Sequence, residues 1–392
     1  MSLRYLSAGE SHGQALMGII DGLPAGIPIS ESALAAQMQR RKMGHGRGRR
    51  QQIETDAVQI LAGVRHGETL GSPVGLLLPN RDWKNWQEIM SPTPIDAETK
   101  RRVHIPRPGH ADLVGAVKYG YRDLRNALER ASARETAMRV ALGCFARQFL
   151  AALDMHVASR VVRIGAQQDL SALNLPVAEL NERVDASPVR ALDKEAEARM
   201  MAEIDRAQAE GDSLGGVFEV YAEGLPIGLG AYSQWDRRLD ARLGEVLLGL
   251  NAIKGVELGL GFRAAEVPGS QAHDEMLPGG QPLDVRYASN HSGGINAGVS
   301  TGQPLVLRVA KKPIATLMRP LDSVDIRSGE AAKAHIERSD TCAVPAAAVI
   351  AESLVCLVLA DFVLEKFGGD SLAEIQERLD LWRQRTQPGQ AD

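Results

Sequence analysis

Two histidines and one aspartate lie in segments where they could transfer protons. His12 stands in GESHG and His110 in RPGHAD, each beside a glycine that lets a ligand approach the backbone closely. Histidine titrates near neutral pH, and two histidines in different environments can act as separate acids. Each histidine alone is also typical of a solvated loop, and Asp340, in ERSD before an apolar run, is also typical of a helix cap. Their chemistry therefore depends on the charged groups around them.

Basic residues are concentrated in the segment RRKMGHGRGRR, residues 40–50, which holds six arginines and lysines and three glycines. The glycines predict a mobile loop, and guanidinium groups hold phosphate and carboxylate in a bidentate manner. We expect this loop to fold over a multiply charged small ligand. A solvated basic turn and a nucleic-acid contact are the alternatives, and the second is disfavoured because the run has no aromatic residue for base stacking.

A second basic cluster surrounds an expected helix start in RASARETAMR, residues 130–139. Ser132 and Glu135 have the spacing of a capping box, which predicts a helix from Ser132 through the low 150s. Its free N–H groups, with Arg130 and Arg134 beside them, would attract phosphate or carboxylate. The alternative is an ordinary surface helix, with ion pairs four residues apart between Arg125 and Glu129 and between Glu135 and Arg139.

Composition indicates a large soluble globular protein. The 392 residues are 44% apolar and 24% charged, and 45 basic against 49 acidic residues give a net charge of −4, which argues against a general nucleic-acid binder. The N-terminus does not have the pattern of a signal peptide. The apolar run at residues 343–367 contains Glu352 and Asp361, so we expect a buried helix rather than a membrane span. Three scattered cysteines suggest neither a disulfide framework nor a metal site and favour a reducing cytoplasm.

The rest of the chain alternates strands and helices, and we expect a single domain over residues 1–392. Strands are expected within residues 3–30, 53–79, 157–165, 215–226 and 251–262, and helices at 30–41, 113–121, 177–185, 193–210 and 236–250. Residues 80–106 should form an ordered irregular loop, and 165–212 a peripheral helical segment. Residues 286–316 are rich in glycine, which is typical either of a backbone platform for a flat ligand or of a tight hairpin.

Seven motifs in order along the chain resemble those of the chorismate synthase family. They are GESHG (9–13), RRKMGHGR (40–47), RPGHAD (107–112), RASARETAMR (130–139), NAIKGVE (251–257), KKPIAT (311–316) and ERSD (337–340). Because they span nearly the whole chain, the resemblance is highly specific. The chain departs from the family at Ala131, where a second serine is common, and in GGINAG (293–298), which is looser than the family's glycine pattern.

The resemblance implies an α+β fold, a β-α-β sandwich with long helices packed between antiparallel sheets, and a homotetramer in the cytoplasm. It implies a lyase of the shikimate pathway that eliminates phosphate from 5-enolpyruvylshikimate 3-phosphate in an anti-1,4 manner to give chorismate. The implied cofactor is reduced FMN, although the reaction is redox-neutral overall, with NADPH as a reductant. It implies no metal and no nucleic-acid or membrane partner.

The same resemblance assigns roles to individual residues. His12 would protonate the departing phosphate, His110 would protonate the reduced flavin, and Asp340 would assist proton removal at the substrate ring through flavin N5. The residues that would line FMN are Arg130, Ala131, Ser132, Asn251, Ala252, Ala297, Lys312, Pro313, Ile314, Ala315, Thr316 and Arg338. Arg41, Arg47 and Arg134 would bind NADP or the substrate's anionic groups.

Two other functions remain as alternatives at this stage. A non-catalytic regulator or RNA-binding protein could use the basic segment, and binding of RNA rather than reduced flavin would identify it. A flavin reductase would oxidise NADPH without the enolpyruvyl substrate.

Overall fold

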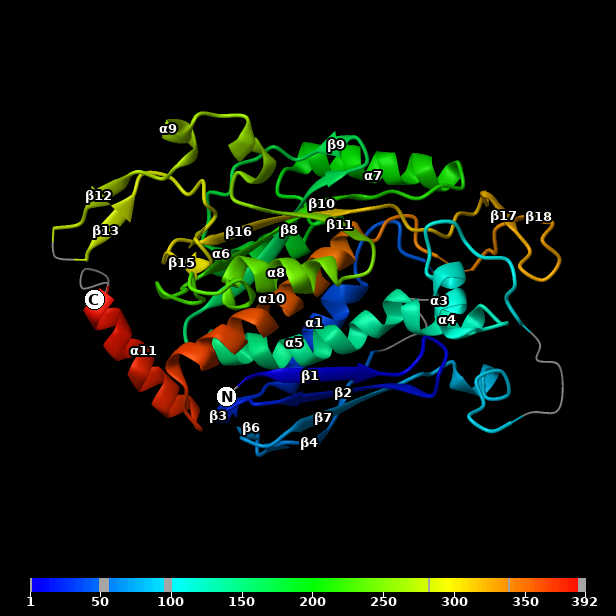
Figure 1. The fold of residues 1–392 in the computed structure, drawn as a ribbon, viewed down its shortest axis with the longest axis horizontal. Helices are drawn as coiled ribbons and strands as arrows, with labels where there is room; N and C mark the ends of the chain where they lie inside the picture. Colours follow the sequence, from blue (N-terminus) through cyan, green and yellow to red (C-terminus); the bar gives the residue numbers. More distant parts are fainter. Residues whose placement is uncertain (1, 49–55, 95–100, 281–282, 338, 387–392) are drawn as a thin grey trace.

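Two antiparallel sheets enclose a layer of long helices in this computed structural model, which describes residues 2–48, 56–94, 101–280, 283–337 and 339–386. Figure 1 shows the smaller sheet below the helices and the larger sheet above them. The β-α-β sandwich expected from the family resemblance is therefore confirmed.

The smaller sheet has the strand order β1-β2-β7-β4 and is antiparallel throughout. Its strands are β1 (Arg4–Ala8), β2 (Ala15–Asp21), β7 (Val74–Pro79) and β4 (Gln59–Ala62). Buried and exposed residues alternate along β2, because only one face packs on the helices. A Cβ atom on Gly18 would lie 2.5 Å from the sulfur of Met138 on α5 (Thr136–Ala151), so glycine permits this close approach.

The larger sheet has the order β11-β16-β10-β8-β9 and carries helices on both faces. Its strands are β11 (Ile253–Leu258), β16 (Leu305–Lys311), β10 (Gly216–Glu223), β8 (His156–Ile164) and β9 (Gln167–Gln168). Helices α6 (Val177–Asp185) and α7 (Lys194–Ala209) cover its outer face, which explains why β8 is buried almost continuously.

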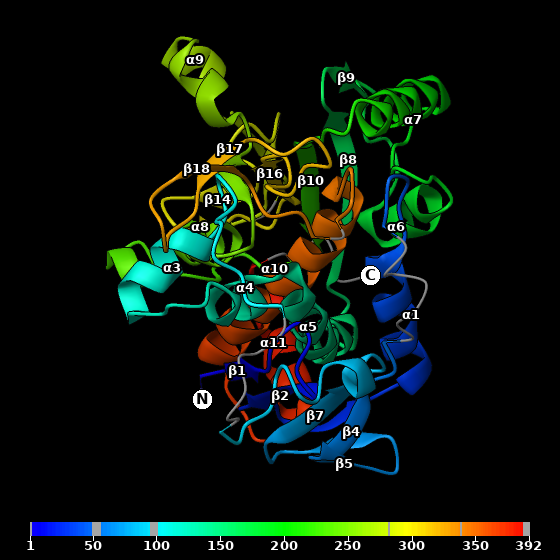
Figure 2. The ribbon, with the colours of Figure 1, turned by 90° about the vertical axis from the view of Figure 1, so that its right-hand side faces the viewer.

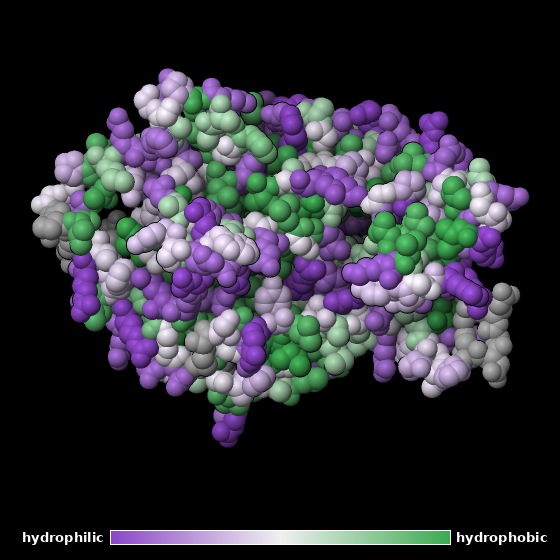
Figure 3. Space-filling view, viewed as in Figure 1, coloured by the Kyte–Doolittle hydropathy of each residue, from purple (hydrophilic) through white to green (hydrophobic). Residues whose placement is uncertain are grey.

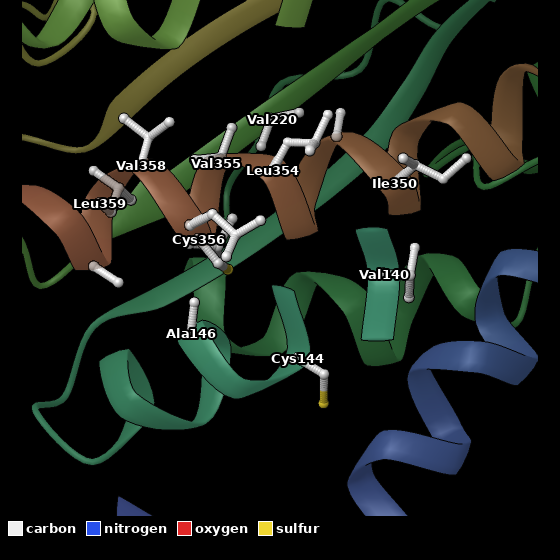
Figure 4. Packing of buried hydrophobic residues seen from close by; sticks show 14 of the residues in the cluster. Val140, Cys144, Ala146, Val220, Ile350, Leu354, Val355, Cys356, Val358 and Leu359 are labelled. Carbon is white, nitrogen blue, oxygen red and sulfur yellow. The ribbon is translucent and has the colours of Figure 1, made fainter. Parts of the chain in front are cut away.

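The helix layer is built around α10 (Val344–Phe367), which packs against α5, β8 and β10. Figure 4 shows Val355 of α10 beside Val220 of β10, with Cys144 and Ala146 of α5 on the other side of the helix. In the described part of the chain, α10 is the helix with the length and apolarity of a membrane span, and its apolar window is wholly buried inside the protein. The expectation of a buried helix is confirmed, with Pro345 in its first turn.

Helices α1 (Glu31–Lys42) and α8 (Leu239–Leu248) complete this layer, and α11 (Leu372–Thr386) follows α10. Shorter strands form a three-stranded sheet of β3 (Ala25–Pro28), β6 (Glu68–Leu70) and β5 (Val64–Arg65). Hairpins pair β12 (Met276–Pro278) with β13 (Val285–Tyr287), β14 (Ile295–Asn296) with β15 (Val299–Ser300), and β17 (Asp322–Val324) with β18 (Ala331–Lys333). The glycine-rich segment thus contains a tight hairpin, one of its two expected forms.

Short helices complete the chain, and two of them lie at one end of the sandwich. They are α3 (Asp112–Tyr119), α4 (Arg125–Ala131) and α9 (Gly269–Ala272), with single turns η1 (Trp83–Asn85), η2 (Ala133–Glu135), η3 (Trp235–Arg237) and η4 (Gly261–Ala265). Figures 1 and 2 place α3 and α4 beside β17 and β18 at that end. Apolar side chains gather over α3, where Val114 and Val117 are exposed (Figure 3).

Two local expectations are wrong. The helix does not begin at Ser132, because Ser132 instead caps the 3-10 turn η2 by accepting from the Arg134 N–H, and α5 starts at Thr136. Glu135 pairs with Arg139 on the next turn, where the capping box would have directed it back to Ser132. The basic segment does not begin as a mobile loop either, since Arg40 and Arg41 form the last turn of α1 and bind protein carboxylates. Residues 49 and 50 of that segment lie outside the described residues.

Candidate active site

His12 is held between a carboxylate and an indole ring. Its Nδ1 lies 2.9 Å and 3.0 Å from the two carboxylate oxygens of Glu129, and its backbone N–H donates to the same group at 2.8 Å. The Trp86 ring stacks on the imidazole with centroids 3.7 Å apart. His12 is buried, so its interpretation as a solvated loop side chain is wrong. Because Nδ1 is taken by Glu129, Nε2 is the ring atom that can face a ligand.

Glu129 lies on α4 and is charged despite its burial. Burial raises the pKa of this carboxyl, but hydrogen bonds and charge from His12, together with the hydrogen bond from Arg125, outweigh burial and hold the pKa below its usual value. The Arg125 Nη1 donates to Glu129 at 2.9 Å. A charged carboxylate can only accept hydrogen bonds, so the imidazole donates to it from Nδ1.

His110 is supported in a similar way by Asp112, at the start of α3. Its Nδ1 lies 2.6 Å from Oδ1 of Asp112, which is completely buried. Burial raises the pKa of Asp112, but hydrogen bonds from His110 and Arg107 outweigh it and hold the pKa well below the usual range. Arg107 donates to Asp112 from Nε at 2.8 Å and to the Thr316 hydroxyl from Nη1 at 2.8 Å. Nδ1 of His110 is therefore taken by Asp112, and its other ring nitrogen, Nε2, lies 3.4 Å from Nη2 of Arg107.

The segment from Lys312 to Thr316 lies against the loop that carries His110. The Lys312 ammonium donates to the Gly109 carbonyl, and the Lys312 backbone N–H donates to the Ala252 carbonyl at 2.9 Å. The carbonyl of Ile314 accepts from the Ser213 hydroxyl at 2.7 Å, while Pro313 is exposed and Ala315 is half-buried. Thus three residues of the expected flavin segment, Lys312, Ile314 and Thr316, are fixed by neighbours from three separate parts of the chain.

The corner between α4 and η2 joins His12 to the larger sheet. The Ser132 hydroxyl donates to the Ser11 hydroxyl at 3.1 Å, and the Asn251 amide donates to the Ala131 carbonyl at 3.1 Å. Arg130 donates to the carbonyls of the β1 segment, Ser7 and Gly9, at 2.9 Å each. A continuous series of contacts therefore brings together the expected site residues His12, Ser132, Ala131, Asn251, Ala252, Lys312 and His110.

Ala252 has a left-handed backbone, with φ of 68°, although it is not glycine. Alanine adopts this conformation at a cost of about 1 kcal/mol or more, and such residues persist where surrounding contacts fix them, often at functional sites. The hydrogen bond from Lys312 to its carbonyl is one such contact. Tertiary contacts, and not the intrinsic preference of alanine, therefore hold Ala252 in the left-handed conformation.

Asp340 lies in an ion pair with Arg47. The Arg47 Nη1 is 2.6 Å from one carboxylate oxygen, and the Gly48 N–H donates to the other at 2.6 Å. Lys311 is buried nearby, and burial, opposed by Asp340 and reinforced by Arg47 and Lys312, lowers its pKa to about 8. Among the described residues, the buried Nε of Arg47 has no hydrogen-bond partner. Together, Arg47, Lys311, Lys312 and Asp340 carry more positive than negative charge, which suits an anionic ligand.

Arg41 and Arg134 converge on Asp56, at 3.5 Å and 2.6 Å respectively. Arg41 also donates to the Ala133 carbonyl and the Thr136 hydroxyl, each at 3.0 Å. Both arginines are buried and hold α1 and η2 together. The anion that they bind in this structure is a protein carboxylate, and their contact with a ligand stays a prediction.

Ala297 is not brought to the other site residues within one copy of the chain. It lies at the tip of the β14–β15 hairpin, near the beginning of β16, whereas Lys312 follows the end of that strand. The seven residues of β16 correspond to about 20 Å at 3.3 Å per residue. Like Ala252, Ala297 has a left-handed backbone, with φ of 50°. Arg338 lies outside the described residues.

Several site residues were not identified from the sequence. The sequence alone indicates Glu129 only as a surface ion-pair partner of Arg125, and it places Asp112 and Lys311 in motifs without assigning them a role. The spacing of Asp112, two residues after His110, was a usable signal. For Trp86, which reaches His12 from a loop more than 70 residues away in the sequence, we find no local signal.

Comparisons with known proteins agree on one family. The family profile described as chorismate synthase matches residues 3–364. A chorismate synthase from Thermobifida fusca is 54% identical, over 96% of this chain and 97% of that protein, and one from Brevibacillus brevis is 51% identical, over 98% and 100%. A solved structure titled as the crystal structure of chorismate synthase superposes with a TM-score of 0.78 at 38% identity, covering 98% of each chain.

Proposed function

This chain belongs to the chorismate synthase family and is thus a phosphate-eliminating lyase of aromatic biosynthesis. From this premise we propose its substrate, its cofactor and its site residues. The substrate is 5-enolpyruvylshikimate 3-phosphate of the shikimate pathway, and anti-1,4-elimination converts it to chorismate. The C–O bond to phosphate and a ring C–H bond break while a ring double bond forms. The observation that carries this proposal is the series of contacts that gathers His12, Ser132, Asn251, Lys312 and His110.

The residues present fit reduced FMN. Among the described residues, the buried Oδ1 of Asn251 has no hydrogen-bond partner, and it is next to the left-handed Ala252. An N–H group of a flavin ring can satisfy such an acceptor. Arg130, Ala131, Ser132, Asn251, Ala252 and the segment 312–316 would hold the cofactor, with Ala297 and Arg338 as further contacts. Reduced flavin supplies transient electron exchange in a reaction that is redox-neutral overall.

The chain's own residues move protons and hold anions. Nε2 of His12 donates a proton to an oxygen of the departing phosphate. His110 would supply the proton that the reduced cofactor takes up, with Asp112 fixing the ring from Nδ1. Asp340 assists removal of the ring proton, and Arg41, Arg47 and Arg134 hold the substrate's anionic groups or NADP. Trp86 covers one face of His12 and limits access of water to it.

The organisation around the site is also part of this proposal. The chain acts as one domain with 165–212 peripheral, assembles as a homotetramer in the cytoplasm, and binds neither nucleic acid nor membrane. Family membership supports an enzyme over a non-catalytic regulator. NADPH is the proposed reductant of the flavin.

An anaerobic assay tests the proposal directly. Purified protein is mixed with chemically reduced FMN and 5-enolpyruvylshikimate 3-phosphate, with and without NADPH, and chorismate and phosphate are measured. We expect equal amounts of both products with reduced FMN and none with oxidised FMN alone. Oxidation of NADPH without substrate would show that the chain also reduces flavin. Failure to release phosphate with reduced FMN would contradict the proposed reaction.

A further inference from the structure

Glu129 contacts His12 more extensively than a simple ion pair requires. Both of its carboxylate oxygens lie within 3.0 Å of Nδ1, and one of them also accepts the backbone N–H of His12. A charged carboxylate can only accept hydrogen bonds, so Nδ1 must carry a proton whenever this contact exists. The neutral ring is therefore the tautomer with Nε2 free, and the protonated ring has a donor at Nε2.

The carboxylate of Glu129 is itself fixed. It is only 1% exposed, and Arg125, one helical turn earlier on α4, donates to it. The Arg125 guanidinium lies 5.3 Å from the Trp86 ring centroid and 3.5 Å from Glu337. Trp86 in turn stacks on His12. Rotation of Glu129 would break contacts with His12 and Arg125 at once, so the imidazole is clamped at one edge and one face.

The other charged groups near His12 do not replace Glu129. Arg101 lies 4.5 Å from the Trp86 ring, and Arg125 donates to Oε1 of Glu129, the oxygen that also lies 2.9 Å from His12 Nδ1. Glu337 acts on His12 through charge, but its own hydrogen bond goes to His335. Within the described ranges of the chain, Glu129 is thus the acid in direct contact with the ring.

We propose that Glu129 is a positioning residue for the elimination: it fixes the His12 tautomer and directs the Nε2 proton of the imidazolium at the leaving phosphate oxygen. In the step, the Nε2–H bond breaks as the proton moves to phosphate, and the C–O electron pair leaves with the phosphate. The ring becomes the neutral Nδ1–H tautomer, which Glu129 already holds. This inference rests on the proposed role of His12.

The test is a double-mutant cycle of Glu129→Gln and His12→Ala, assayed for single-turnover rate with chemically reduced FMN. Glutamine keeps the shape but removes the charge. We expect Glu129→Gln alone to slow elimination by about 10- to 100-fold, with substrate KM changed by about twofold or less. In the His12→Ala background the same change should have almost no further effect, because Glu129 acts through His12. Losses that multiply independently would overturn the proposal.

The matched control is Glu219→Gln, which removes another buried carboxylate that is paired with arginine. Glu219 lies on β10, 2.9 Å from Arg160, and belongs to no part of the proposed site. We expect its turnover to stay within about twofold of the original protein. An equal loss in both variants would assign the Glu129 effect to general weakening of the fold and would overturn the proposal.

A measurement without turnover separates this inference from the proposed function. Protein labelled with ¹⁵N-histidine should show a strongly deshielded Nδ1 proton that is absent in His12→Ala and moves upfield in Glu129→Gln, because a neutral amide accepts a weaker hydrogen bond. If the protein makes no chorismate but shows this proton, the proposed function fails and the positioning contact stands. Absence of the proton in the original protein would contradict the contact itself.

Discussion

Replacing Glu352 with glutamine should strongly destabilise the protein. Glu352 lies in the middle of α10 and is completely buried. It accepts hydrogen bonds from Arg40 at 2.9 Å and 3.0 Å, from Arg147 at 2.6 Å and from Arg190 at 3.1 Å. Glutamine fits the same volume but leaves three guanidinium groups around a neutral amide whose NH₂ cannot accept. Asp185 is then the remaining carboxylate that contacts Arg40 and Arg190.

The size of the loss follows from the pKa of Glu352. Burial raises this pKa, but the charges of Arg40, Arg147 and Arg190 outweigh burial and lower it from 4.5 to about 2. At about 1.4 kcal/mol per pKa unit, this difference corresponds to roughly 3 to 4 kcal/mol. Breaking a buried ion pair by removing one partner costs about 3–5 kcal/mol, which agrees. The pKa of Arg190 is lowered to about 9 by burial and by Arg40 and Arg147, so the arginines repel one another once Glu352 is neutral.

The sign of the pH dependence is fixed by the depressed pKa. The contribution of Glu352 is complete above the unfolded value near 4.5 and is lost as the pH falls toward about 2. Urea unfolding followed by circular dichroism should show the variant less stable by about 3 kcal/mol at pH 7, and the difference should shrink below about pH 4.5. Glu210→Gln, in an exposed pair with Arg206, is the control and should change stability by less than about 0.5 kcal/mol. Equal stabilities at pH 7, or a difference that grows on acidification, would refute this reasoning.

Other predictions concern the site. His110→Ala should move the absorption spectrum of bound reduced FMN toward the anionic form, whereas His12→Ala should leave it nearly unchanged, and each should lower turnover about a hundred- to ten-thousandfold; identical spectra in all three proteins would contradict the division of roles. Arg47→Ala should raise the substrate KM by about tenfold or more, because a charge-assisted hydrogen bond contributes about 1.5–3 kcal/mol; unfolding at room temperature would show instead that its pair with Asp340 is structural. FMN with substrate should raise the melting temperature, since ligand at about 100 times its Kd stabilises the native state by about 2.7 kcal/mol, and calorimetry that shows no shift at saturation would argue against flavin binding.

The sequence determined the family through its motifs, the sandwich architecture only through that resemblance, and most elements through their local patterns. Hydrophobic period and turn residues are local properties, so the sequence predicts α6 with its observed ends, and Glu352 and Asp361 indicate that α10 is a buried helix. A serine hydroxyl can cap an α-helix or a 3-10 turn at nearly the same position. The capping-box spacing therefore places the start of α5 at Ser132, four residues before its observed start at Thr136. Ser132 there caps a 3-10 turn, since its hydroxyl also reaches Ser11 on a distant loop.

The working geometry of the site was decided only by tertiary structure. Residue type and motif identified His12 and His110 as acids, but whether a ring is solvated or clamped depends on groups that folding brings from elsewhere. Glu129 and Arg125 satisfied the rule for a surface ion pair on a helix, yet folding buries that pair against His12 and Trp86. Arg40, within an expected anion-binding loop, instead reaches Glu352, more than 300 residues away. The packing of two sheets on one helix layer buries these residues and brings together charges that are far apart in the sequence. The local sequence around each residue does not determine which charges will meet.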